Sequence, residues 1–238
     1  ADAQRRAEEA QRIAELEKRK LQEREQREAN EHAEQARLEQ VQRQAAHKLV
    51  DGIKLGGWIV LAANEAAGDP VRSVIVGSGV NSDGRTVGMA MPSPERQADL
   101  LRHMQRELQF DPDDLAFLEC HGTGTPVGDP MEAHAIGEVF GRRRSRPLAI
   151  GSAKTNFGHL EPASGLVGLL KAQMALEKGV YPASLHVNEL NPNIAFDDLN
   201  LEVASEPVKI ESRDKPWLAG VNSFGFGGTN GSVIMRKV

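Results

Sequence analysis

The spacing of apolar and polar residues divides the chain into two parts. Residues 1–50 contain neither glycine nor proline and carry 11 basic and 11 acidic side chains. Glutamates repeatedly stand four residues before arginines, as Glu8 does before Arg12, and this order favours helical ion pairs. The apolar residues form only a thin, interrupted heptad stripe. The pattern predicts a long charged α-helix over residues 1–51, which is either a solvated single helix, a weak coiled coil or a docking segment.

A cluster of glycines at positions 52, 56 and 57 ends this helix. Beyond it, apolar runs rich in β-branched residues alternate with segments of helical period, which predicts a second domain over residues 52–238. Strand–helix–strand alternation of this kind is typical of an α/β fold with a largely buried sheet. The expected strands are 58–63, 71–80, 115–120, 147–153, 217–224 and 229–237, and the expected helices are 94–108, 129–140 and 165–178.

Three glycine-rich turns follow expected strands: HGTGTPVGD, KTNFGH and NSFGFGGTNG. In α/β sheets, binding and catalytic residues gather at strand ends, where a rigid scaffold holds the loops. Glycine also lets backbone N–H groups approach a developing negative charge. None of the turns has the spacing of a phosphate-binding loop. The alternative is that the glycines only make tight turns. The candidate polar residues are His121, Thr123, Thr125, Lys154, Asn156, His159, Asn222 and Asn230.

Cys120, the single cysteine of the chain, directly precedes His121. The pair is open to two interpretations, a cysteine nucleophile or a catalytic histidine beside an inert thiol. Side chains alternate along a strand, so the two neighbours point to opposite faces. If His121 faces a site, Cys120 faces the packed interior.

Composition excludes several classes of function. The net charge of −5 offers no basic surplus for nucleic acid. The longest apolar run, Trp58–Ala63, is far shorter than a membrane span, and no spacing of Cys and His suggests a metal site. One cysteine and the lack of an N-terminal apolar segment predict a cytoplasmic protein. The arginines between positions 142 and 146 form either a solvated loop or a patch for an acidic carrier.

The segments ECHGTGTPVGDPMEA, GSAKTNFGHLEPASGLVGLLKA and AGVNSFGFGGTNG closely resemble the C-terminal half of β-ketoacyl synthases. The resemblance covers roughly residues 57–238 and is closest to the ketosynthases of modular polyketide synthases and animal-type fatty acid synthases. It implies a thiolase-like fold, in which two similar α/β halves form a layered sandwich. It also implies decarboxylative Claisen condensation of malonyl-type extender units with acyl thioesters. The substrates would be carried on the phosphopantetheine of an acyl carrier protein, with no bound cofactor.

The same resemblance assigns roles to residues of the three turns. His121 and His159 match the two catalytic histidines of the family, and Lys154 matches its lysine. Phe226 matches the acyl gate, and the surrounding turn supplies backbone N–H groups. The substrate-binding candidates are Thr123, Thr125, Asn156, Phe224, Phe226 and Gly227.

The family nucleophile, by contrast, is a cysteine of the N-terminal half, and its motif does not occur in this sequence. Cys120 fills a position that is ordinarily a small strand residue, which favours a packing role. The resemblance therefore implies a separate or unrepresented N-terminal half and a dimeric assembly, and we expect the lone half to expose a large apolar face of its sheet. Two alternatives stay open. The chain could be a catalytically silent protein that binds another part of a synthase, or a malonyl-thioester decarboxylase that needs no cysteine.

Overall fold

The computed structural model describes residues 71–86, 88 and 91–238, together with residues 22 and 26. The chain separates into two compact units, Ala1–Gly68 and Asp69–Val238, and the described residues belong almost entirely to the second. The predicted helix over residues 1–51 and the predicted strand over residues 58–63 lie outside the described residues, apart from Gln22 and Gln26, which are helical.

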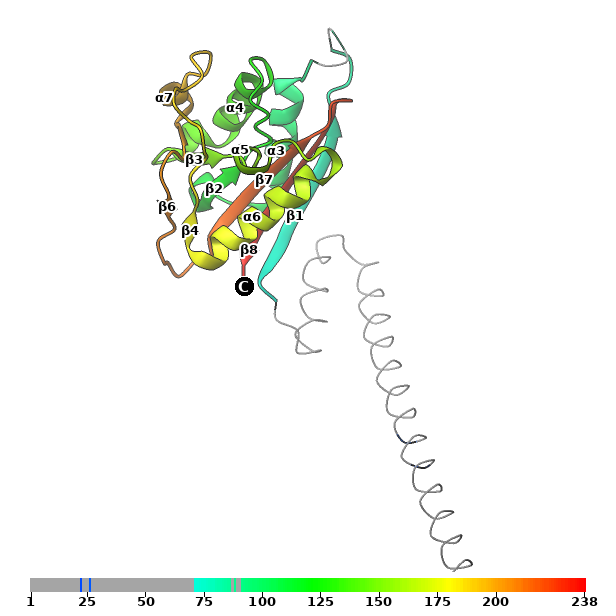
Figure 1. Ribbon diagram of the computed structural model, residues 1–238, viewed down its shortest axis with the longest axis vertical. Coiled ribbons are helices and arrows are strands. Elements are labelled where there is room, and N and C mark those ends of the chain that lie inside the picture. Colours follow the sequence, from blue (N-terminus) through cyan, green and yellow to red (C-terminus); the bar gives the residue numbers. More distant parts are fainter. Residues whose placement is uncertain (1–21, 23–25, 27–70, 87, 89–90) are drawn as a thin grey trace, which may run out of the picture. The chain divides into compact units, whose positions relative to one another are not determined.

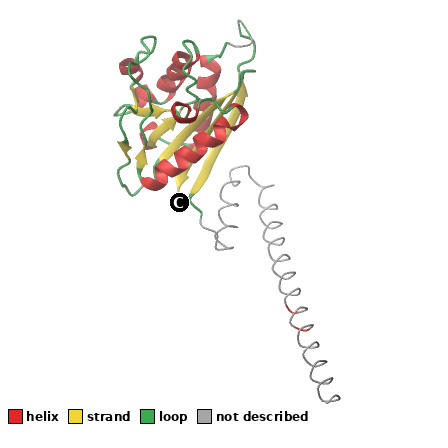
Figure 2. Cartoon of the chain, in the orientation of Figure 1, coloured by secondary structure: helices red, strands yellow, loops and turns green. Residues whose placement is uncertain are grey.

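A six-stranded mixed sheet forms the centre of the second unit (Figure 1 and Figure 2). Its order is β1-β8-β7-β2-β3-β5. The pairs β1–β8 and β8–β7 are antiparallel, whereas β7–β2, β2–β3 and β3–β5 are parallel. The strands are β1 (Ser73–Ser82), β2 (Leu115–Glu119), β3 (Leu148–Gly151), β5 (Leu201–Val203), β7 (Leu218–Phe224) and β8 (Thr229–Lys237). A separate two-stranded sheet pairs β4 (Val180–Tyr181) with β6 (Val208–Lys209).

Three long helices cover the two faces of the large sheet. The helices α3 (Pro94–Leu108) and α4 (Gly128–Val139) pack against each other, and α6 (Ser164–Lys178) packs on β7 and β8. Figure 1 shows α6 lying across these strands. The predicted α/β fold is confirmed, and every expected helix and strand within the described residues is present with small shifts at its ends. The short helices are α5 (Lys154–Phe157), α7 (Phe196–Leu199), and the 3-10 turns η2 (Pro112–Asp114), η3 (Gly141–Arg143) and η4 (Glu161–Ala163).

The central strand β2 separates two apolar cores. Leu118 belongs to the core that contains residues of α3 and α4, whereas Phe117 belongs to the core that contains residues of α6. Both side chains are fully buried. Neighbouring residues of a strand point to opposite faces, so one short apolar strand serves both layers.

The outer face of α6 is apolar and exposed. Leu166, Leu170 and Met174 recur every four residues and therefore share one side of the helix. Their side chains are 64%, 59% and 57% exposed, respectively. Gly168, Ala172 and other residues of the opposite side are buried. We expected the sheet itself to expose an apolar face. The expected apolar surface lies mainly on the outer side of α6, which covers β7 and β8, while the sheet itself exposes Ile75 and Val80 of β1.

The arginines of residues 142–146 are held by intramolecular contacts. Arg142 forms an ion pair with Glu138, and Arg143 donates to Gln105 at 2.9 Å. The buried Arg144 donates to the carbonyl of Pro112. These contacts favour a structural role for the buried Arg144, whereas Arg142 and Arg143 are exposed and engage only part of their donors.

Candidate functional site

The three glycine-rich turns meet at one edge of the sheet. Strands β7, β2 and β3 are adjacent and parallel, so their carboxyl ends lie side by side. The HGTGT turn follows β2, the turn that begins α5 follows β3, and the FGFGG turn follows β7. Ligand sites of α/β sheets commonly form at this edge. The topology therefore brings together turns that are separated by up to about a hundred residues in the sequence.

His121 is half-buried and faces the other two turns. Its Nδ1 accepts the backbone N–H of Phe224 at 3.2 Å, and its ring lies 5.5 Å from the ring of Phe224. The rings of His121 and His159 are 5.5 Å apart between centroids and nearly perpendicular. The two histidines that the sequence singled out are therefore neighbours in the fold.

His159 is held through the same ring atom. Its Nδ1 accepts the backbone N–H of Glu161 at 3.0 Å and lies 3.0 Å from Oγ of Ser164, the first residue of α6. A neutral imidazole has one N–H and one acceptor nitrogen. Because the Nδ1 atom of each histidine accepts a backbone N–H, the neutral ring carries its proton on Nε2. Both histidines are thus arranged to donate a hydrogen bond from Nε2.

Burial lowers the pKa of His121 to about 4, and the charges of Lys154 and His159 act on this pKa in the same direction. The ring is therefore neutral at physiological pH. A neutral imidazole keeps one N–H, with which it can donate a hydrogen bond to a developing oxyanion.

We expect the pKa of His121 to make the fold sensitive to acid. The unfolded chain takes up a proton near the ordinary value of 6.5, whereas the folded chain resists protonation until about pH 4. The unfolded state thus binds more protons between these values, so stability decreases as the pH falls through this window. The free energy of unfolding should be measured from pH 7 to pH 4 for the wild type and for His121→Gln. The advantage of the wild type should shrink toward pH 4, and a constant difference would contradict the prediction.

Lys154 begins α5 at the end of β3 and is half-buried. Burial lowers the pKa of its ammonium group, while the carboxylates of Glu132 and Glu119 act in the opposite direction. Lys154 lines a cavity of about 610 Å³ together with Ser152 and Thr155. Its positive charge disfavours the protonated ring of His121 and so contributes to the lowered pKa of that histidine.

Two carboxylates of α4 hold the HGTGT turn, and the sequence analysis did not single them out. Glu132 is fully buried and accepts the backbone N–H groups of His121 at 2.8 Å and of Gly122 at 2.9 Å. Asp129 accepts the N–H of Gly124 at 3.0 Å. The sequence feature that could have identified these two acids is their spacing, because residues three apart at the start of a helix share one face. They fix the backbone that carries His121.

A cavity of about 540 Å³ collects most of the predicted site residues. Lys154, Asn156, Asn222 and Gly227 are not among the residues that line it; Asn156 and Gly227 are exposed, and Asn222 is buried. Phe226 lies at the cavity but is 76% exposed, in agreement with a side chain free to move. The predicted residues that do line it are His121, Thr123, Thr125, His159, Phe224, Phe226 and Asn230.

Cys120 packs into the core that contains residues of α3 and α4. Burial raises the pKa of its thiol well above the ordinary value, and the negative charges of Glu132 and Glu119 raise it further. A reactive cysteine needs exposure and positive surroundings. Cys120 is buried, and the charges that shift its pKa are those of carboxylates. The geometry supports the interpretation of Cys120 as an inert packing residue.

We expect the thiol of Cys120 to react slowly because it is buried and protonated. Iodoacetamide should label the native chain at a rate at least about tenfold below that of the unfolded chain at the same pH. Mass spectrometry would follow the added carbamidomethyl group over time. Rapid stoichiometric labelling of the native chain would show that the thiol is accessible and ionised.

Within the part of the chain that the structure describes, no helix has the length and apolarity needed to cross a membrane. Over the same residues, no three side chains of His, Cys, Asp or Glu come together as a metal site.

Comparison with known proteins identifies the class. Residues 72–188 match the family described as "Beta-ketoacyl synthase, C-terminal domain", and residues 191–238 match "Ketoacyl-synthetase C-terminal extension". The chain therefore belongs to the β-ketoacyl synthase family and contains the C-terminal half of its ketosynthase domain.

The similar proteins are polyketide synthases. A highly reducing polyketide synthase of Aspergillus terreus is 50% identical over 174 residues, which are 72% of this chain and 7% of that protein. One component of the phenolphthiocerol/phthiocerol polyketide synthase of Mycobacterium tuberculosis is 44% identical over 71% of this chain and 9% of its own length. The chain thus spans a small fraction of these relatives.

Solved structures confirm the thiolase-like fold. The ketosynthase from module 6 of the bacillaene synthase of Bacillus subtilis superposes with a TM-score of 0.71 at 35% identity. The match covers 75% of this chain and 33% of that ketosynthase. Ketosynthase twelve of the bacillaene polyketide synthase of Bacillus amyloliquefaciens also gives a TM-score of 0.71 at 35% identity, over 75% of this chain and 32% of its own.

Proposed function

We propose that this chain supplies the two histidines of a β-ketoacyl synthase that condenses malonyl-type extender units with acyl thioesters. The observation that carries the proposal is the paired arrangement of His121 and His159. Each ring uses Nδ1 to accept a backbone N–H, so each Nε2–H is available as a donor. The rings lie 5.5 Å apart beside one cavity, within reach of a shared oxygen atom.

The reaction needs two donors at one oxygen. When a malonyl thioester loses CO₂, the electron pair of the broken bond moves into an enolate, and negative charge develops on the thioester oxygen. Preorganised donors at such an oxygen lower the barrier because they need not reorient during the reaction. The ammonium group of Lys154 adds a positive charge that acts on His121. This charge would also stabilise the negative charge that develops on the thioester oxygen.

Condensation further needs a nucleophile that holds the acyl chain, and the buried Cys120 does not fit that role. We assign the nucleophile to an N-terminal ketosynthase half, and the substrates to the phosphopantetheine of an acyl carrier protein. We assign the gate for the acyl chain to Phe226, because it lines the cavity and is largely exposed. We assign contacts with the pantetheine arm to Thr123 and Thr125, which line the cavity and whose hydroxyls are 3.3 Å apart.

The exposed stripe of α6, formed by Leu166, Leu170 and Met174, is the surface on which we place the N-terminal half. A contiguous apolar patch of this kind marks an interface. Phe157 and Leu160, which are 65% and 41% exposed, precede the helix and add apolar area. Docking there would place the second half next to His159, because Ser164 starts the helix and contacts its ring.

The direct test is reconstitution of the chain with an N-terminal ketosynthase half, an acyl thioester to load its nucleophile, and a malonyl-loaded acyl carrier protein. Release of CO₂ together with a β-ketoacyl product would support condensation. Release of CO₂ without a β-ketoacyl product would support the decarboxylase alternative. The histidine pair is compatible with that alternative, because two N–H donors can stabilise the enolate without an acyl-cysteine intermediate. No CO₂ release from a stable assembly would contradict both functions.

A further inference from the structure

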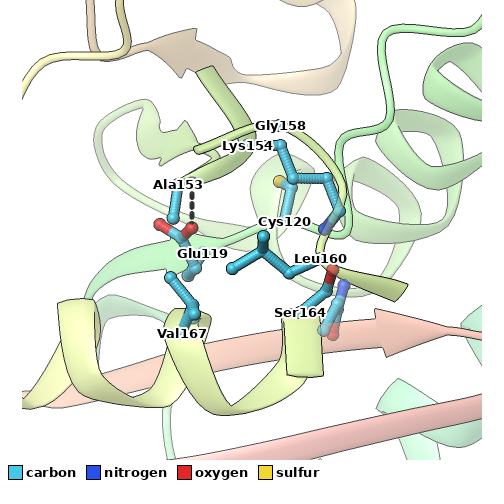
Figure 3. A pocket seen from close by; sticks show the side chains of 10 residues that line it. Glu119, Cys120, Ala153, Lys154, Gly158, Leu160, Ser164 and Val167 are labelled. Carbon is cyan, nitrogen blue, oxygen red and sulfur yellow. Dashed lines mark hydrogen bonds between the residues drawn. The ribbon is translucent and has the colours of Figure 1, made fainter. Parts of the chain in front are cut away.

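A buried ion pair lies directly behind the site and takes no part in the chemistry proposed above. Glu119, the last residue of β2, is 2% exposed and lies 2.7 Å from Nζ of Lys171 on α6. The same carboxylate accepts the hydroxyl of Tyr181 at 2.8 Å. Its other oxygen accepts the backbone N–H of Ala153, the contact drawn as a dashed line in Figure 3. A buried charge is retained only where such partners satisfy it.

The surroundings are shaped to admit this carboxylate. A side chain at Gly168 would bring its Cβ to 3.4 Å from Cγ of Glu119, and to 3.1 Å from Val221. A side chain at Gly151 would bring its Cβ to 2.8 Å from the hydroxyl of Tyr181. Tyr181 in turn stacks on Phe117 at 4.1 Å between ring centroids. The carboxylate therefore occupies a fixed position.

The partners of Glu119 belong to the elements that carry the candidate catalytic side chains. Glu119 itself stands two residues before His121. Ala153, whose N–H it accepts, directly precedes Lys154. Lys171 lies on α6, the helix whose first residue contacts the ring of His159. Figure 3 shows Glu119 beneath the turn of Ala153 and beside α6.

We propose that Glu119 is a positioning residue whose single carboxylate sets the relative placement of the HGTGT turn, the turn that begins α5, and α6. This inference rests on the proposed function for its kinetic consequence. The carboxylate matters because it has two oxygens. One accepts the N–H next to Lys154, while the other is held by Lys171 and Tyr181. An amide offers a single acceptor oxygen, so it cannot satisfy both sides at once.

Two double variants test the acceptor that Glu119 provides behind the site. Glu119→Gln with Lys171→Met removes both charges but keeps one acceptor oxygen. Glu119→Leu with Lys171→Met also removes both charges and preserves the volume, but it leaves the N–H of Ala153 and the hydroxyl of Tyr181 without their acceptor. Replacing a buried ion pair by neutral groups commonly leaves a protein folded. Asp99→Asn is the control, because it neutralises an exposed carboxylate of the ion pair with Arg102.

Malonyl decarboxylation should be measured with each variant in the reconstituted synthase, at a temperature where thermal unfolding shows the variant to be folded. We expect the Leu-containing pair to lower kcat by about tenfold to 100-fold with little change in KM, since small displacements of catalytic groups have effects of this size. The Gln-containing pair should stay within about threefold of the wild type. Equal kcat values for the two pairs, whether both stay near the wild-type value or both fall below it, would overturn the positioning role.

A second readout does not depend on activity. The imidazole ¹⁵N signals of His159 report its hydrogen bond with Glu161, and they can be recorded for the chain alone. The signals should shift in the Leu-containing pair and stay near the wild-type values in the Gln-containing pair and in Asp99→Asn. If His121→Ala leaves decarboxylation intact while these shifts occur, the proposed function fails and the positioning role stands. If the His159 signals are unchanged in the Leu-containing pair, the positioning role fails whatever the activity.

Discussion

Replacing either histidine by alanine is expected to lower malonyl decarboxylation by about 10²- to 10³-fold, and by no less than about tenfold. The physical reason is that His121 and His159 each donate from Nε2 to the oxygen on which charge develops. Groups that act as one unit are not additive. The variant that lacks both rings should therefore be little worse than the poorer single variant. The rate should be measured as CO₂ release by the chain assembled with an N-terminal ketosynthase half.

Cys120→Ala is the matched control for these changes, because it alters the neighbouring residue on the opposite side of the strand. Its thiol is buried and has a raised pKa, so its removal should leave the rate nearly unchanged. Decarboxylation that persists without both histidines, or that disappears with Cys120, would contradict the assignment of the site.

A charge in the middle of the α6 stripe is expected to prevent assembly with the N-terminal half. Leu170 is exposed and lies between Leu166 and Met174 on the outer side of the helix. Leu170→Asp would place an unpaired carboxylate in an apolar interface and should weaken association by roughly 100-fold or more. Association can be measured by analytical ultracentrifugation or by calorimetry of the two halves.

The comparison variant is Leu190→Asp, which places the same charge on a leucine that is 53% exposed but lies outside the stripe. It should assemble like the wild type. Unchanged assembly of Leu170→Asp, with both variants folded, would show that the N-terminal half does not cover α6.

Local pattern was sufficient to predict the elements and to single out the turns that hold the candidate site residues. The apolar period of residues 94–108 and the β-branched strands around it predicted α3 and the sheet, because burial of one face imposes a period on the sequence. The resemblance of the three glycine-rich turns to one family identified His121 and His159. Strand alternation also predicted that Cys120 points away from the histidine, into the core where it lies.

Other features depended on contacts between residues distant in the sequence. The order β7-β2-β3, which brings the turns together, results from strand pairing that no local pattern specifies. The proton on Nε2 of His121 follows from an N–H that is 103 residues away, and its pKa of about 4 follows from burial by several elements.

The roles of the buried acids were likewise decided by the tertiary structure. Glu119 and Glu132 look like ordinary charged residues in the sequence, yet both are almost fully buried and hold backbone N–H groups of the site. A carboxylate is stable there only because the fold brings donors to it from other elements. The sequence by itself determined which residue types line the turns, through local periodicity and motif. The tertiary structure decided how those residues are oriented and charged, because hydrogen bonding and desolvation depend on neighbours that are close only after folding.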